Sequence, residues 1–288
     1  AKGALVEGKK ARKPESLIYV ELSPLPAELT AAELTRQIEG VMAHVTASVE
    51  DWETMRNRAL VLAEQFTASK TGSSKAESEE IRDLLLWLAG NHFVFLGIGD
   101  YRVKGAGLAL DAASALGIYR LEGSKTTIEH ATHPVASDTL SVLKASAFSR
   151  VHRHTPMDLV VLKRFDAKGK FVGETRMLGL FTSTVYYRET QNIPFIRRKT
   201  ARVLERAGFD LNGHSGKTLK TILEFLPRDE LFQMDEERLF QTAMGIVALD
   251  AKPQVRLFVR HDPFERFVSS MVYIPRERFS SDMRLEII

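Results

Sequence analysis

The sequence predicts an α+β protein whose strands pair mainly in antiparallel fashion. Short runs rich in β-branched and aromatic residues, such as His92–Ile98 and Phe171–Phe181, have the composition of strands. Segment 28–66 instead repeats apolar residues at helical spacing. Hydrophobic residues make up 44% of the chain and charged residues 27%, which is ordinary for folded domains. We therefore expect buried cores rather than bulk disorder.

Length and composition exclude several classes of protein. The 288 residues have room for two or three units of about 100 residues each. The absence of cysteine excludes disulfides, thiolate zinc sites and cysteine nucleophiles. No apolar run reaches the roughly 20 residues that span a bilayer, and the basic N-terminal segment lacks the apolar core of a signal peptide. We expect a cytoplasmic protein with no membrane partner.

The first 78 residues predict a helical segment between two polar stretches. Residues 1–15 are expected to form a disordered leader, and Ser16–Leu22 a strand that two prolines end. Segment 28–66 predicts one long amphipathic helix or two consecutive ones. Thr67–Ser78 has the small, polar composition of a linker and marks the clearest boundary.

The middle of the chain predicts a sheet domain with one covered face. A helix over Glu79–Gly90 ends at a Gly-Asn cap signal, and Asp166–Gly169 is a turn suited to a hairpin. Helices are expected again over Ile196–Ala207 and Lys217–Leu226. The predicted strands are His92–Ile98, Leu116–Leu121, Thr139–Ala145, Asp158–Phe165 and Phe171–Phe181.

The last segment predicts the order β-α-β-β-α. Its expected elements are a strand over Glu230–Met234, a helix over Asp235–Leu249 capped by its aspartate, strands over Val255–His261 and Arg266–Ile274, and a helix capped by Ser280 or Ser281. This order is one strand short of a ferredoxin-like βαββαβ unit, the topology of small regulatory domains of the ACT type. We therefore expect the chain to be a piece of a larger protein.

No motif in the sequence predicts a complete catalytic, cofactor or metal site. Gly213–Thr218 resembles a phosphate loop, but Leu211 stands where the motif needs glycine, so Ser215 is interpreted as a helix cap. The pairs Gly97/Gly99 and Gly105/Gly107 do not complete GxGxxG and are interpreted as turn residues. His261–Glu265 and Gly97–Asp100 are weak candidates for ligand contacts, and simple hairpin connections explain them better.

The charged clusters also have simple structural explanations. His152 and His154, like His130 and His133, lack a third metal ligand and are interpreted as surface residues. The paired carboxylates Asp229-Glu230 and Asp235–Glu237 are explained by caps and the helix dipole. A basic stripe is interpreted as an outer face paired with carboxylates, because it lacks the interleaved aromatic residues that would favour nucleic acid; it comprises Arg197, Arg198, Lys199, Arg202 and Arg206.

Four blocks resemble the large bacterial NAD-specific glutamate dehydrogenases. The resemblance extends from about Ser16 onward, and the last two blocks are the most specific. The blocks are EIRDLLLWLAGNHFVFLGIGDYRV (Glu80–Val103), Leu178–Phe209, LEFLPRDELFQMDEERLFQTAMGI (Leu223–Ile246) and VRLFVRHDPFERFVSSMVYIPRERF (Val255–Phe279). Members of that family are several times longer, and their catalytic region lies C-terminal to these blocks.

The resemblance implies a non-catalytic N-terminal portion of such an enzyme, with ACT-like modules flanking a PAS-like sheet domain. The implied division is 16–70 for the closing strand and helices of one ACT-like module, 79–181 for the PAS-like domain, 182–226 for a helical connector and 227–288 for a truncated ACT-like module. The parent enzyme would oxidise L-glutamate to 2-oxoglutarate and ammonia with NAD, and this chain would hold no cofactor. Its partners would be its own downstream catalytic region, other subunits of a homo-oligomer and an amino-acid or metabolite effector.

Two other classes of function stay open. A stand-alone ligand-sensing or scaffold protein would share these folds without an attached enzyme. Nucleic-acid binding through Arg197–Arg206 would require retention on a polyanion that weakens steeply with salt. Neither has a motif in its favour.

Overall fold

The computed structural model describes residues 17–24, 26, 29–66, 74–105, 107–121, 138–262 and 267–280. The chain divides into two units, residues 1–40 and 41–288, which are considered separately. The predicted leader (1–15), the histidines at 130 and 133, the connection at 263–266 and the helix expected after Ser280 lie outside the described residues.

The predicted N-terminal strand is wrong for the residues that are described. Residues 17–24 adopt no regular secondary structure, and no strand of the described chain pairs with them. A strand needs a hydrogen-bonded neighbour, which the alternating sequence cannot provide by itself. The helical prediction for 28–66 is confirmed as two consecutive helices, α1 (Ala31–Glu50) and α2 (Trp52–Gln65).

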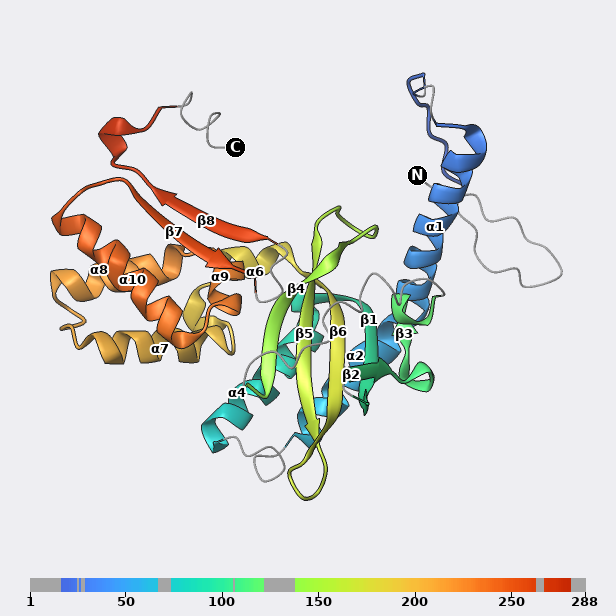
Figure 1. Ribbon diagram of the computed structural model, residues 1–288, viewed down its shortest axis with the longest axis horizontal. Coiled ribbons are helices and arrows are strands. Elements are labelled where there is room, and N and C mark those ends of the chain that lie inside the picture. The colour runs from blue at the N-terminus through green and yellow to red at the C-terminus, as the bar shows by residue number, and fades with distance from the viewer. Residues whose placement is uncertain are drawn as a thin grey trace. The chain divides into compact units, whose positions relative to one another are not determined.

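An antiparallel sheet forms the centre of the second unit. Its strands lie in the order β2-β1-β6-β5-β4, with β3 paired to β1 (Figure 1). Their bounds are β1 Phe93–Lys104, β2 Gly107–Leu110, β3 Leu116–Gly117, β4 Leu140–Phe148, β5 Pro156–Phe165 and β6 Phe171–Phe181. The β5–β6 hairpin is confirmed: Asp166 accepts hydrogen bonds from the backbone amides of Lys168 and Lys170, and Gly169 takes the left-handed conformation.

The sheet is buried on both faces, so the prediction of one covered face is wrong; its strand residues alternate between two apolar clusters. On β6, Met177 and Phe181 belong to one cluster, and Leu178 and Leu180 to the other. The first cluster also includes residues of α2 and of α4 (Lys75–Trp87), which continues into a helical turn, η1 (Leu88–His92). Because α4 begins at Lys75, the predicted linker, which ends at Ser78, extends four residues too far; its part at 67–73 lies outside the described residues.

Helices dominate between β6 and the last hairpin. They are α6 (Ser183–Tyr187), η4 (Thr190–Asn192), α7 (Ile196–Ala207), α8 (His214–Phe225), α9 (Arg228–Gln233) and α10 (Glu236–Ala251). The strands β7 (Arg256–His261) and β8 (Val268–Tyr273) then pair antiparallel, and a short helix η5 (Arg276–Arg278) follows. α7 has the predicted bounds, and the predicted cap of α10 is confirmed because Asp235 accepts from the Arg238 amide.

The predicted strand over Glu230–Met234 is wrong, because this segment forms α9 instead. Leu231 and Phe232 are adjacent in sequence and both buried, which a half-buried strand would not allow. Asp229 and Glu230 lie in the first turn, where the helix dipole favours carboxylates. The observed order of the last segment is therefore α9-α10-β7-β8 rather than β-α-β-β.

Three smaller expectations also fail. Only Leu116–Gly117 of the predicted strand 116–121 pairs with β1, and Ile118–Arg120 forms a 3₁₀ turn, η3. Gly97 and Gly99 lie inside β1 rather than in turns, at a place where Tyr119 packs too close to Gly97 for a Cβ atom. Gly213, not Ser215, is the residue before α8, and no side chain caps that helix.

Gly117 gives a direct test of this close packing. It has φ +60°, and a Cβ atom there would overlap the Leu96 carbonyl oxygen. We expect Gly117→Ala to lower the free energy of unfolding by roughly 2–3 kcal/mol, from strain plus overlap. Gly169→Ala is the matched control, because Gly169 has φ +77° with open space around it; its cost should be roughly 1 kcal/mol. Urea unfolding of both variants checks this, and equal losses would contradict the packing argument.

Within the described residues, no helix combines the length and the apolar character needed to cross a bilayer.

Candidate functional site

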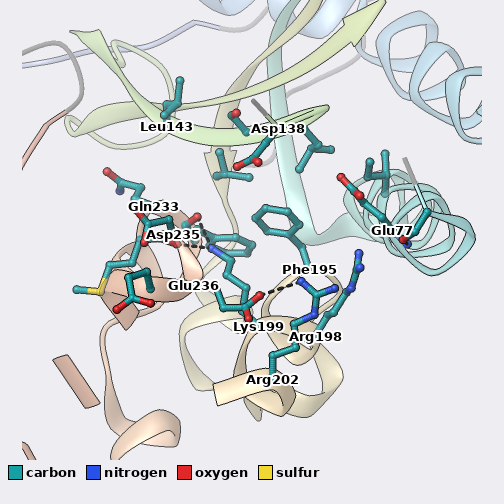
Figure 2. A pocket seen from close by; sticks show the side chains of 18 residues that line it. Glu77, Asp138, Leu143, Phe195, Arg198, Lys199, Arg202, Gln233, Asp235 and Glu236 are labelled. Atoms are coloured by element: carbon teal, nitrogen blue, oxygen red, sulfur yellow. Dashed lines mark hydrogen bonds and ion pairs between the residues drawn. The ribbon is translucent and has the colours of Figure 1, made fainter. Parts of the chain in front are cut away.

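A cavity of about 780 Å³ lies within the second unit (Figure 2). Its walls come from the start of α4, the first half of β4, the N-terminal half of α7 and the junction between α9 and α10. Apolar side chains of Leu140, Val142 and Phe232 line it together with charged side chains of both signs. A cavity of this size and mixed lining is typical of a site for a small molecule.

Lys199 of α7 joins one wall of the cavity to another. Its ammonium donates hydrogen bonds to the backbone carbonyl oxygens of Leu231, Phe232 and Met234, at 2.8, 2.9 and 2.7 Å. These carbonyls lie at the end of α9, where helix geometry leaves carbonyl groups without intrahelical partners. The Lys199 nitrogen also lies 4.6 Å from the centroid of the Phe195 ring. Lys199 therefore fixes the α9–α10 junction against α7.

Phe195 holds an unusual backbone conformation beside the cavity. It precedes α7 with φ +71°, which is uncommon for a bulky residue. The Glu80 carboxylate on α4 accepts from the Phe195 amide at 2.8 Å, and Arg197 donates to Glu80 and to Asp83. These bonds attach the start of α7 to α4. In the view of Figure 2, the Phe195 ring lies between Asp138 and Lys199.

The basic stripe of α7 mostly pairs with carboxylates, as predicted. Arg202 pairs with Glu236 at 2.8 Å, Arg206 contacts Glu237, and Arg197 contacts α4 as described above. Two residues are exceptions: backbone carbonyls rather than carboxylates surround Lys199, and Arg198 has no carboxylate partner among the described residues. The sequence analysis missed this role of Lys199 because the carbonyl groups that it contacts lie at the end of α9, a segment that was predicted to be a strand.

Two charged side chains on the cavity wall have no hydrogen bond or ion pair with the described residues. They are the guanidinium of Arg198, in the first turn of α7, and the carboxylate of Glu77, in the first turn of α4. Both residues are half-buried. Charged groups that are partly buried are normally paired within the protein. Arg198 and Glu77 differ from this pattern among the described residues.

Lys199 should make the stability of the protein depend on pH. Burial lowers its pKa from 10.5 to about 7, against the attraction of Asp138, Asp235 and Glu236. Between pH 7 and 10.5 the unfolded chain then binds more protons at this site than the folded chain, so stability rises with pH. We expect this contribution to be roughly 2 kcal/mol between pH 7 and 9. Urea unfolding at both pH values should show a smaller rise in Lys199→Met; an unchanged rise would contradict the assignment.

A second polar network connects α9 to the last hairpin and to the sheet. Arg260 of β7 donates two hydrogen bonds to Glu230, at 2.7 and 2.8 Å, and Ser269 of β8 donates a third at 2.6 Å. Lys144 of β4 bridges Asp158 at 2.6 Å and Asp229 at 3.1 Å. The carboxylates of Asp229 and Glu230 thus make tertiary ion pairs, beyond the local role that the sequence predicted.

The remaining sequence candidates are not brought together into a site. His154 stacks on Phe148, and His152 lies in a loop. Asp100, at the end of the Gly97–Asp100 segment, pairs with Arg58 and Arg164 within the fold. No cluster of three or more metal-ligating side chains occurs in the part of the chain that the structure describes.

Comparison with known proteins identifies related chains. Residues 193–252 match the family model described as "Glutamate dehydrogenase, helical motif 1", and residues 256–288 match "Glutamate dehydrogenase, ACT2 domain". The chain is 38% identical over 284 residues to the NAD-specific glutamate dehydrogenase of Pseudomonas aeruginosa. It is homologous to a segment of NAD-specific glutamate dehydrogenases. The enzymes of that name from Halomonas elongata and Mycobacterium tuberculosis are 36% and 28% identical to it.

The similarity to these dehydrogenases covers nearly all of this chain but little of theirs. The Pseudomonas and Halomonas alignments each include 95% of this chain and 18% of the relative, and the Mycobacterium alignment includes 97% and 17%. The chain thus spans less than a fifth of the length of the relatives it matches. The match to the helical motif contains α7 to α10, and therefore Lys199 and Arg198.

Proposed function

We propose that this chain is a non-catalytic N-terminal regulatory and assembly segment of an NAD-dependent glutamate dehydrogenase. The observation that carries the proposal is the extent of the similarity, which includes 95% of this chain but only 18% of each of two glutamate dehydrogenases. The glycine motifs agree with it, because Gly97 and Gly99 pack against Tyr119 within a sheet instead of opening a nucleotide-binding helix. The NAD and glutamate sites would lie elsewhere in the parent protein.

The proposed organisation follows the predicted divisions. The antiparallel sheet within 79–181 would be a PAS-like domain, and 227–288 would include an ACT-like module. The match of 256–288 to an ACT2 domain model supports the second assignment. Residues 16–70 would belong to another ACT-like module through their helices, since the described part of the predicted strand forms no pairs. We propose a cytoplasmic location for the parent enzyme.

Regulation would require an effector that binds two conformations of the parent enzyme with different affinities. The partners we propose are the parent's own catalytic region, other subunits of a homo-oligomer and an amino-acid or metabolite effector. The cavity beside Lys199 supports the effector, because it is large enough for a small molecule and is lined by residues of five separate elements. A ligand there would contact both the sheet domain and the helices that follow it.

The reading frame and the parent protein test this function. We expect the coding sequence to continue beyond Ile288, and the full-length product to oxidise glutamate with NAD. A stop codon directly after Ile288 would favour the stand-alone sensor or scaffold. A continuous frame whose purified product leaves glutamate unchanged would contradict the proposed parent reaction.

A further inference from the structure

From the two charged side chains on its wall that have no partner among the described residues, we infer that the cavity beside Lys199 binds a small zwitterion, with a carboxylate against Arg198 and an ammonium group against Glu77. This inference rests on the proposed regulatory function and names the site and the ligand chemistry for it.

Arg198 is the group that suits an anion. Of the three basic side chains on the wall, Lys199 donates to three backbone carbonyls and Arg202 pairs with Glu236. Arg198 alone among them has no ion pair or hydrogen bond with the described residues. Its planar guanidinium can bind both oxygens of a carboxylate at once. It also lies in the first turn of the twelve-residue helix α7, where the dipole favours negative charge.

Glu77 is the group that suits a cation. The other acidic side chains from the α9–α10 junction are already engaged: Asp235 caps α10, Glu236 pairs with Arg202, and Glu237 pairs with Arg206. The Glu77 carboxylate makes no such contact with the described residues, whereas its backbone amide donates to the Ser74 hydroxyl that caps α4. An ammonium group of the ligand would give it the partner that the described protein does not supply.

The apolar part of the wall indicates what else the ligand carries. Phe195, Leu140 and Val142 line the same cavity, so an aliphatic or aromatic side chain fits beside the two charged groups. Phe195 is held by Glu80 in its strained backbone conformation, which keeps its ring at the cavity. The ligand class is therefore a small molecule that carries a carboxylate, an ammonium group and an apolar side chain, as α-amino acids do.

Isothermal titration calorimetry of this 288-residue chain tests the inference with three sets of probes. The first set is the free amino acids. The second is their amides, which lack the carboxylate, and the third is their N-acetyl forms, which lack the ammonium. We expect at least one free amino acid to bind, and to bind roughly 10- to 100-fold more tightly than either derivative.

Two variants then assign each end of the ligand. Arg198→Met should weaken the amino acid by roughly 10- to 100-fold and abolish its advantage over the amide, while Glu77→Gln should abolish its advantage over the N-acetyl form. Arg82→Met on the exposed face of α4 and Glu205→Gln on the exposed face of α7 are matched controls that should bind like the unaltered chain. Circular dichroism of each variant confirms that it is folded.

Two results would overturn the inference. One is that no amino acid binds the unaltered chain; the other is that one binds equally well to folded Arg198→Met and Glu77→Gln. Either result would leave the proposed function intact, because that is decided by glutamate oxidation in the full-length protein. Conversely, amino-acid binding as expected, together with no dehydrogenase activity in the full-length protein, would support the binding site but contradict the proposed parent enzyme.

Discussion

Replacing Phe181 by alanine should lower the free energy of unfolding by roughly 3–5 kcal/mol. Phe181 ends β6 and is 2% exposed. Its ring stacks on Phe232 of α9 at 4.6 Å between centroids and meets Phe93 of β1 edge-on at 5.3 Å. Removing the ring would leave a cavity where the sheet meets the helices, and these neighbours cannot close it without moving whole elements.

The control for Phe181→Ala is Phe225→Ala. Phe225 is the same residue type at the end of α8, and it is 81% exposed. Its removal should change stability by no more than a few tenths of a kcal/mol, roughly the range of exposed substitutions. Chemical denaturation followed by circular dichroism measures both. A loss below roughly 1 kcal/mol for Phe181→Ala would mean that the sheet and α9 do not share one core.

Replacing Glu230 by alanine should be about as damaging, for an electrostatic reason. It would leave the guanidinium of Arg260 buried without the carboxylate to which it donates two hydrogen bonds. Breaking a buried ion pair from one side costs roughly 3–5 kcal/mol. Glu237→Ala, which removes an exposed partner of Arg206, is the matched control and should leave the urea midpoint nearly unchanged. Equal effects would contradict the role assigned to the buried pair.

The same pair should make the protein sensitive to acid. Burial raises the pKa of Glu230, but the hydrogen bonds from Arg260 and Ser269 outweigh burial and hold the pKa below its usual value. The folded chain therefore binds fewer protons at Glu230 than the unfolded chain as the pH falls through its ordinary range. The stabilisation is present above that range and is lost as the pH falls through the folded pKa. Acid unfolding of Glu230→Gln should lack this part of the transition.

Local patterns predicted the elements whose signals are local. The bounds of β6 and α7 and the aspartate cap of α10 follow from residue periodicity and capping chemistry, and the structure confirms them. Phe171–Phe181 alternates between two faces, and the turn before it carries Asp166 and Gly169 at the positions that a hairpin needs. Periodicity, capping and turn chemistry each depend on residues only a few positions apart, so they can be identified from the sequence and are found again in the folded protein.

The failures occurred where tertiary contacts decide the outcome. Glu230–Met234 is too short for periodicity to separate a strand from a helical turn, and its state depends on Arg260 and Lys199, which are distant in sequence. Residues 17–24 have a strand's composition but no pairing partner in the described chain. The cavity was unpredictable for the same reason: Glu77 and Arg198 lie 121 positions apart, and only packing places them on one wall.

Incubating this chain alone with glutamate and NAD tests the non-catalytic assignment most directly. The full-length protein from the same gene serves as the positive control, and calorimetry with NAD shows whether the short chain binds the cofactor. We expect no NADH formation and no NAD binding by the short chain, and NADH formation by the full-length protein. Glutamate-dependent NADH formation by residues 1–288 alone would contradict the non-catalytic assignment.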